Sequence, residues 1–66
     1  GHAKDAFRRA WIQQYCAKKA GYEEPREVLL ARHGLSQAQW DAELAAATAS
    51  PAALKNLESE GAAACP

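Results

Sequence analysis

Cys16, Cys65 and His33 are the residues of this 66-residue chain whose side chains could do distinctive chemistry. The two cysteines stand near opposite ends of the chain, and Cys65 is the last residue but one. A disulfide between them would close nearly the whole polypeptide into one loop, which is typical of proteins from oxidising compartments. The pair therefore predicts a structural disulfide Cys16–Cys65 and a periplasmic or secreted protein, although no signal sequence is visible.

The length of the chain gives this disulfide its importance. A single small domain buries only about 60% of the surface that its unfolded chain exposes, so it is marginally stable. Closing a loop of about fifty residues removes roughly 4 kcal/mol of chain entropy from the unfolded state in the chain-entropy model. Gly1 and His2 are predicted to be a remnant of an expression tag, which leaves residues 3–66 as one helical domain.

Other chemistry at these residues has less support. Thiol redox chemistry at Cys16 would be favoured by Lys18 and Lys19, but the C-terminal half of a helix disfavours a thiolate, and reactive dithiols lie close in sequence. Free thiols or an intermolecular bond remain open alternatives to the structural disulfide.

Metal binding and catalysis are not expected. The chain holds no CxxC or HxxxH pair, so Cys16, His33 and Cys65 lack the spacing of a metal site, and His33 is interpreted as a surface residue. There is no glycine-rich phosphate loop and no nucleophile motif. We therefore predict a protein without enzyme activity, catalytic residues or cofactor.

The pattern along the chain predicts helices and no strands. Alanine is abundant, β-branched residues are few, and no segment alternates apolar and polar residues with period two. The predicted helices run from Ala3 to Ala20, from Pro25 to His33, from the cap Ser36 past Ala47, and from the cap Ser50 towards Ala64. Gly61 leaves the end of the fourth helix open, because a glycine can either continue a helix or end it.

Local signals indicate where the middle helices begin. Pro25 suits the first position of the second helix, since its missing N–H would have no partner there. Val28 and Leu29 are expected to begin the buried face of this helix, and Leu30 and Ala31 can broaden it. In the third helix, Ser36 and Gln39 have the spacing of a capping box.

Aromatic residues mark the expected core. Phe7, Trp11 and Tyr15 recur every four residues, so the first helix presents one aromatic stripe. Phe7 and Trp40 are expected in the core. Tyr15 is expected nearer its edge, because its hydroxyl group prefers contact with water.

A regular up-down-up-down bundle conflicts with a Cys16–Cys65 bond. In such a bundle the end of the fourth helix lies beside the start of the first, whereas Cys16 lies nearer the other end. The mismatch is roughly 15 to 20 Å along the first helix, but bridged Cα atoms lie only about 4.4 to 6.8 Å apart. We therefore predict an all-α fold, a small irregular, orthogonal bundle of four helices closed by Cys16–Cys65, in which the short second helix crosses the first obliquely.

The charges argue against nucleic acid as a partner. Eight Lys and Arg residues balance eight Asp and Glu residues, so no net field attracts polyanions. Residues 25–47 have the outline of a helix-turn-helix unit, but residues 36–43 contain no Lys or Arg, and Asp41 and Glu43 would repel phosphate. No transmembrane segment is expected, because no apolar run is long enough.

Protein contact is the expected mode of action, as a binding, inhibitor, immunity or accessory module with an unknown protein partner. Trp11, Tyr15, Arg8 and Arg9 are the candidate partner-binding residues, because Trp, Tyr and Arg carry most binding energy at interfaces. The alternative is that these aromatic residues serve only the core. We expect a monomer or weak homodimer.

Two other functions remain open. One is a periplasmic acid-stress chaperone, in which neutralised carboxylates would loosen the packing and expose apolar surface. The other is a helical docking domain from a larger cytoplasmic protein, in which the cysteines would be reduced.

Overall fold

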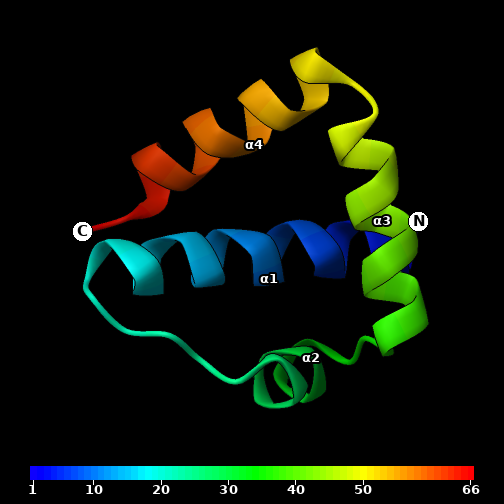
Figure 1. Cartoon of the computed structure of the whole chain (residues 1–66), viewed down its shortest axis with the longest axis horizontal. Helices are drawn as coiled ribbons and strands as arrows, with labels where there is room; N and C mark the ends of the chain where they lie inside the picture. Colours follow the sequence, from blue (N-terminus) through cyan, green and yellow to red (C-terminus); the bar gives the residue numbers. More distant parts are fainter.

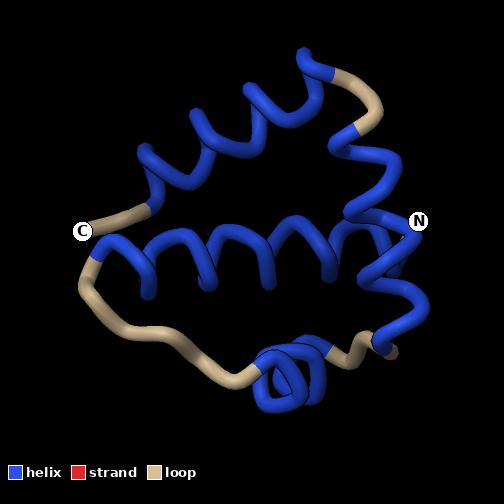
Figure 2. Tube along the Cα trace, in the orientation of Figure 1, coloured by secondary structure: helices blue, strands red, loops and turns tan.

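A computed structural model describes residues 1–66 as an all-α bundle without strands (Figure 1; Figure 2). Its helices are α1 (His2–Lys19), α2 (Arg26–His33), α3 (Gln37–Thr48) and α4 (Pro51–Ala64). In Figure 1, α3 runs across the N-terminal end of α1, α2 is seen end-on, and α4 runs in the same direction as α1. The predicted irregular, orthogonal bundle is confirmed.

Glycine residues end the first two helices in the left-handed conformation, with φ of 83° at Gly21 and 68° at Gly34. After α1, the N–H of Gly21 donates to the Lys18 carbonyl, and the N–H of Tyr22 donates to the Ala17 carbonyl. These bonds satisfy carbonyls that the end of a helix otherwise leaves unpaired. Both turns therefore depend on a residue without a Cβ atom.

Helix α2 differs from the prediction at its start and on its buried face. Pro25 precedes the helix with an extended ψ of 137°, so the helix begins one residue later, at Arg26. Leu29 and Leu30 are buried, whereas Val28 is 44% exposed. Because neighbouring residues lie about 100° apart around a helix, Val28 lies about 160° from Leu30 and falls outside the side on which both leucines are buried.

The predicted starts of α3 and α4 are confirmed. The Ser36 hydroxyl accepts from the Gln39 N–H at 3.1 Å, and the Gln39 side chain accepts from the Ser36 N–H at 2.9 Å. In α4, the Ser50 hydroxyl accepts from the Ala53 N–H at 3.2 Å, and Pro51 occupies the first turn. Both caps follow from local sequence, because each joins groups only three residues apart.

Trp40 lies at the centre of the core with 1% of its surface exposed. The centroids of the Phe7 and Trp40 rings are 4.8 Å apart. The Arg26 guanidinium lies 4.4 Å from the Trp40 ring centroid, in cation–π geometry. The core cluster consists of Ala6, Phe7, Ala10, Leu29, Leu30, Leu35, Trp40, Ala47 and Leu57. The prediction that Phe7 and Trp40 are core residues is confirmed.

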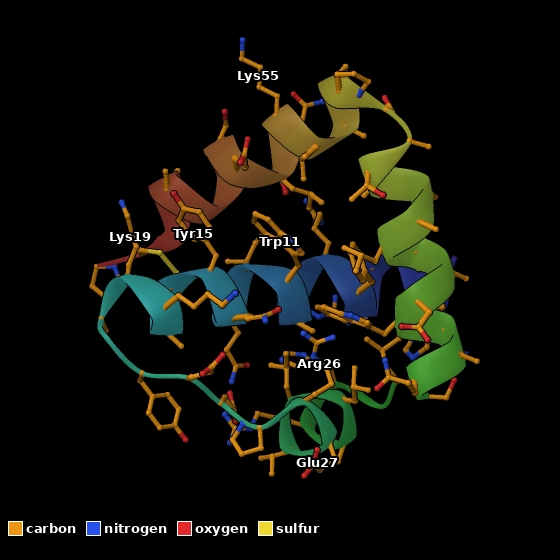
Figure 3. All side chains as sticks on the ribbon, in the orientation of Figure 1. Trp11, Tyr15, Lys19, Arg26, Glu27 and Lys55 are labelled. Atoms are coloured by element: carbon orange, nitrogen blue, oxygen red, sulfur yellow. A yellow bond between two sulfur atoms is a disulfide. The ribbon has the colours of Figure 1, made fainter.

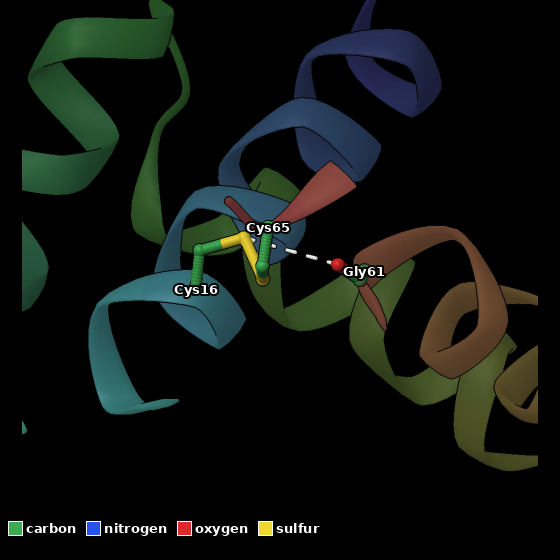
Figure 4. The surroundings of a disulfide bond; sticks show 3 residues. All are labelled: Cys16, Gly61 and Cys65. Atoms are coloured by element: carbon green, nitrogen blue, oxygen red, sulfur yellow. Dashed lines mark hydrogen bonds between the residues drawn. A yellow bond between two sulfur atoms is a disulfide. The ribbon is translucent and has the colours of Figure 1, made fainter. Parts of the chain in front are cut away.

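The Cys16–Cys65 disulfide is formed, with a Cα–Cα distance of 5.3 Å (Figure 4). It joins the second half of α1 to the residue that follows α4, so these two helices converge at their C-terminal ends. The Gly61 carbonyl oxygen lies 3.8 Å from the Cys16 sulfur. This is a packing contact, because a disulfide sulfur carries no hydrogen to donate.

Gly61 allows α4 to approach α1 closely, and the helix continues through it to Ala64. A Cβ atom at position 61 would lie 2.9 Å from Tyr15 Cδ1 and 3.3 Å from Trp11 Cζ3. The nearest atoms belong to the base of the Tyr15 ring, which cannot move aside without shifting the whole side chain. The aromatic pair of α1 therefore packs against bare backbone.

This close packing predicts that Gly61→Ala destabilises the fold. Helix propensity alone would stabilise the variant by about 1 kcal/mol, but overpacking typically costs about 1–3 kcal/mol. We expect the free energy of unfolding, measured by urea titration with circular dichroism, to fall by about 1 kcal/mol. Ser59→Ala, at an exposed position of α4, is the matched control and should change stability little. A more stable Gly61→Ala variant would show that the contact is loose.

Candidate functional site

Four residues of α1 form a line along the side that faces α4: Arg8, Trp11, Tyr15 and Lys19. Their spacing of three or four residues places them on one side of the helix. Figure 3 shows Trp11 and Tyr15 between the two ribbons, with Lys19 near the converging end. We call this line, together with Leu57, Glu60 and Gly61 of α4, the α1–α4 seam.

The aromatic pair is the rigid part of the seam. The rings of Trp11 and Tyr15 stack with centroids 5.5 Å apart and planes 22° apart. Both side chains are half-buried, and both touch the position where Gly61 lacks a side chain. The Lys19 ammonium lies 5.7 Å from the Tyr15 ring centroid. The pair thus serves the packing of α1 on α4 and also keeps exposed area.

An ion pair crosses the seam next to the aromatic pair. Arg8 Nη1 lies 3.3 Å from both carboxylate oxygens of Glu60. Their side chains are 52% and 41% exposed, so water screens the pair and its contribution to stability is small, about 0–1 kcal/mol. Both groups are therefore available to a partner at little cost to the fold.

Arg9 does not share this surface. It follows Arg8 directly, and a helix turns about 100° per residue. Arg9 acts electrostatically on His33 of α2, where it lowers the pKa of that side chain. The structure thus brings Arg8, Trp11 and Tyr15 together at the seam and directs Arg9 towards α2.

A cleft opens where the N-terminal parts of α1 and α4 diverge. Its volume is about 430 Å³, and it lies between α1, α3 and α4. Three buried apolar residues, Phe7, Ala47 and Leu57, form part of its wall. The cleft therefore continues the seam as an apolar recess large enough for a partner side chain.

Charged residues surround this recess. Lys4 and Arg8 of α1 line it on one side, and Glu43 of α3 and Glu60 of α4 line it on others. Asp5 also lines the cleft, and the rim as a whole carries both signs of charge. An apolar centre with a mixed polar rim is the general layout of a protein-binding surface.

A second polar cluster lies on the opposite side of α1, where α2 packs. The Glu24 side chain is only 5% exposed, although it carries a carboxylate. It lies 2.9 Å from Arg32 Nη2 and accepts from Gln13 Nε2 at 2.8 Å. Gln13 Oε1 in turn lies 2.7 Å from His33 Nε2. We call Gln13, Glu24, Arg32 and His33 the Glu24 network.

The chemistry of the network fixes the orientation of its members. A carboxylate only accepts hydrogen bonds, so Gln13 must turn its NH₂ group to Glu24 and its oxygen to His33. His33 Nε2 must therefore carry a hydrogen and donate it. Burial lowers the pKa of His33 most, and the positive charges of Arg9 and Arg32 lower it further, while Glu24 acts in the opposite sense.

Sequence reasoning did not find this network. It interpreted His33 as a surface residue, whereas the structure shows a half-buried His33 bonded to α1. The Glu24 carboxylate, which drew no chemical prediction, contacts Arg32 and Gln13. The bonded pairs of the network lie 8 to 20 positions apart in the sequence, and no motif of the sequence signals their contact.

No group of three His, Cys, Asp or Glu side chains lies close enough together to hold a metal ion. No helix has both the length and the apolar character that a crossing of a membrane requires. No protein-family model, curated protein or solved structure matches the chain. The fold and the two clusters define it as a small, disulfide-closed, all-α protein.

The environment of His33 predicts an acid-sensitive stability. A histidine whose folded-state pKa lies below its ordinary value of about 6.5 takes up its proton more readily when unfolded. Stability is therefore full above about pH 6.5 and decreases as the pH falls from there through the folded-state pKa.

His33→Gln tests this prediction, because glutamine can still donate to Gln13 but cannot be protonated. We expect the free energy of unfolding of the parent protein to decrease between about pH 7 and about pH 5, and that of the variant to decrease less. Urea titrations across this range provide the measurement. Equal slopes in the two proteins would contradict the assignment to His33.

Proposed function

We propose that this chain is a small, non-catalytic, secreted or periplasmic protein that binds another protein through the α1–α4 seam. The observation that carries the proposal is the stacked, partly exposed pair Trp11–Tyr15, which stands beside Arg8 on a seam that continues into an apolar cleft. Trp, Tyr and Arg are the residue types that carry most binding energy at protein interfaces.

The rigidity of the seam supports this proposal. The disulfide ties α1 to the end of α4, and the close contact at Gly61 holds both aromatic rings in place. A surface that is ordered before binding loses little conformational entropy when the partner arrives. The exposed Arg8–Glu60 pair can exchange its partners for charged groups of another protein.

The disulfide also supports the proposed location. Disulfides form and persist in secreted and periplasmic proteins and are rare in the cytosol, where thiols are kept reduced. A helical docking domain of a cytoplasmic protein would instead carry two free thiols. Mass spectrometry of unreduced protein from its native compartment separates these cases, and free thiols would contradict the proposed location.

Arg8 and Arg9 offer a matched pair of variants to test the seam. Arg8→Glu and Arg9→Glu make the same change of charge at neighbouring, exposed positions on different sides of α1. We expect Arg8→Glu to weaken binding by about tenfold or more, equivalent to about 1.4 kcal/mol, and Arg9→Glu to have little effect. Immobilised parent and variants identify the partner from the source organism, and calorimetry with that purified partner gives the affinities.

Both variants must first show the circular dichroism spectrum of the parent. Loss of binding with Arg9→Glu but not Arg8→Glu would move the interface to the α2 side of α1. Unchanged binding with both would reject Arg8 and Arg9 as residues of the interface.

A second candidate function is a periplasmic acid-stress chaperone, which the Glu24 network favours. On acidification the half-buried His33 becomes a cation beside Arg9 and Arg32, so the packing of α2 weakens. Such a chaperone would expose apolar surface at about pH 2 to 3 and bind a hydrophobic dye while keeping its helices. A compact protein without dye binding at this pH would exclude the chaperone.

A further inference from the structure

The residues that precede and form α2 are attached to the rest of the molecule differently from the other helices. Residues 22–33, which we call the α2 flap, comprise the loop after Gly21 and helix α2. The disulfide bonds α1 to the residue that follows α4, and the flap lies within the loop that it closes but carries neither cysteine. In Figure 1 the flap lies on the side of α1 away from α4.

Three attachments hold the flap closed. Leu29 and Leu30 are buried in the core, and the Arg26 guanidinium covers the Trp40 ring at 4.4 Å. The third attachment is the Glu24 network, in which Gln13 of α1 bonds both Glu24 and His33 of the flap. Gln13 thus joins both ends of the flap to α1. The network supplies the hydrogen bonds that hold the flap, while Leu29 and Leu30 supply the apolar contacts.

The contacts of the network use the charge of the Glu24 carboxylate and need no positive charge on His33. Charged Glu24 accepts from Gln13 and neutralises Arg32. The groups that face His33 are Arg9 from α1, Glu24 from the loop and Arg32 from α2 itself. A protonated His33 would therefore meet two cations and only one anion.

We propose that the α2 flap opens in response to acid: protonation of His33 loosens the Glu24 network and raises the population of an open flap while α1, α3 and α4 stay together. The burial of Leu29 and Leu30 keeps the closed state dominant at neutral pH. Opening removes Arg26 from Trp40 and uncovers the apolar surface formed by Phe7 and Trp40. This inference does not depend on the partner-binding proposal, because it concerns the isolated protein.

Hydrogen exchange with mass spectrometry measures the opening in each helix. We expect the opening constant of residues 22–33, corrected for intrinsic exchange rates, to rise severalfold between about pH 7 and about pH 5. That of residues 51–64 should change little over the same range. A uniform rise in all helices, or no rise in the flap, would overturn the proposal.

Variants of the network distinguish its groups. His33→Gln keeps the donor to Gln13 without a titrating group, so its flap should lose most of the pH response. Glu24→Gln removes the charge at every pH and should open the flap severalfold more often at pH 7. The control Glu23→Gln changes an exposed carboxylate one position away and should behave as the parent. A full pH response in His33→Gln would overturn the role of His33.

Fluorescence gives a second, independent measurement. Trp11 and Trp40 are the only tryptophans, so Trp11→Phe leaves Trp40 as the reporter of the flap. We expect its emission to shift to longer wavelength on acidification before the helical circular dichroism signal decreases. A single transition in both signals would show global unfolding and would overturn the local opening.

Discussion

The disulfide between Cys16 and Cys65 is the constraint on which the arrangement of the helices depends. It holds two residues 49 positions apart with Cα atoms 5.3 Å from each other. Because Cys16 lies in the second half of α1, α4 must end beside the C-terminal part of α1. Helices α1 and α4 therefore run in the same direction, and the two helices between them must turn the chain twice (Figure 1).

This arrangement divides the surface of α1 between different tasks. Towards α4, the chain brings bare backbone at Gly61 against Trp11 and Tyr15, and the two helices converge there. Further from the disulfide, α1 and α4 diverge and leave the cleft bordered by α3. Towards α2, α1 carries Gln13, which bonds the polar groups of the flap, and Arg9, whose charge lowers the pKa of His33. With the disulfide in place, α1 thus has one rigid side, which packs on α4, and one side towards α2 whose contacts depend on charge.

Because the core is small, the contacts on both sides of α1 matter for the stability of the fold. Only nine apolar residues are buried. One of them, Trp40, contacts both Phe7 of α1 and Arg26 of α2. A domain of this size has little apolar burial in reserve, so a buried carboxylate with several partners matters more than in a large protein. The Glu24 network and the disulfide therefore complement a core that is modest by itself.

Much of the fold was predictable because it depends on local or covalent relations. The capping box at Ser36 joins groups three residues apart, and the turn at Gly34 needs only a residue that tolerates positive φ. The start of α2 was misplaced by one residue, because Pro25 fits either the cap or the first position of a helix. Val28 was misplaced because hydrophobicity alone does not show which side of a short helix faces its neighbours.

By itself, the sequence determined the all-α class, the starts of α3 and α4, the buried Phe7 and Trp40, and the pairing that excludes a regular bundle. These follow from spacing along the chain, which local physics converts directly into structure. Only the tertiary structure decided that Arg8 and Arg9 lie on different sides of the molecule's central helix, and that Gln13, Glu24, Arg32 and His33 meet. Such contacts depend on how the helices cross, and the crossing is fixed by the balance of all the packed surfaces together and not by any one segment.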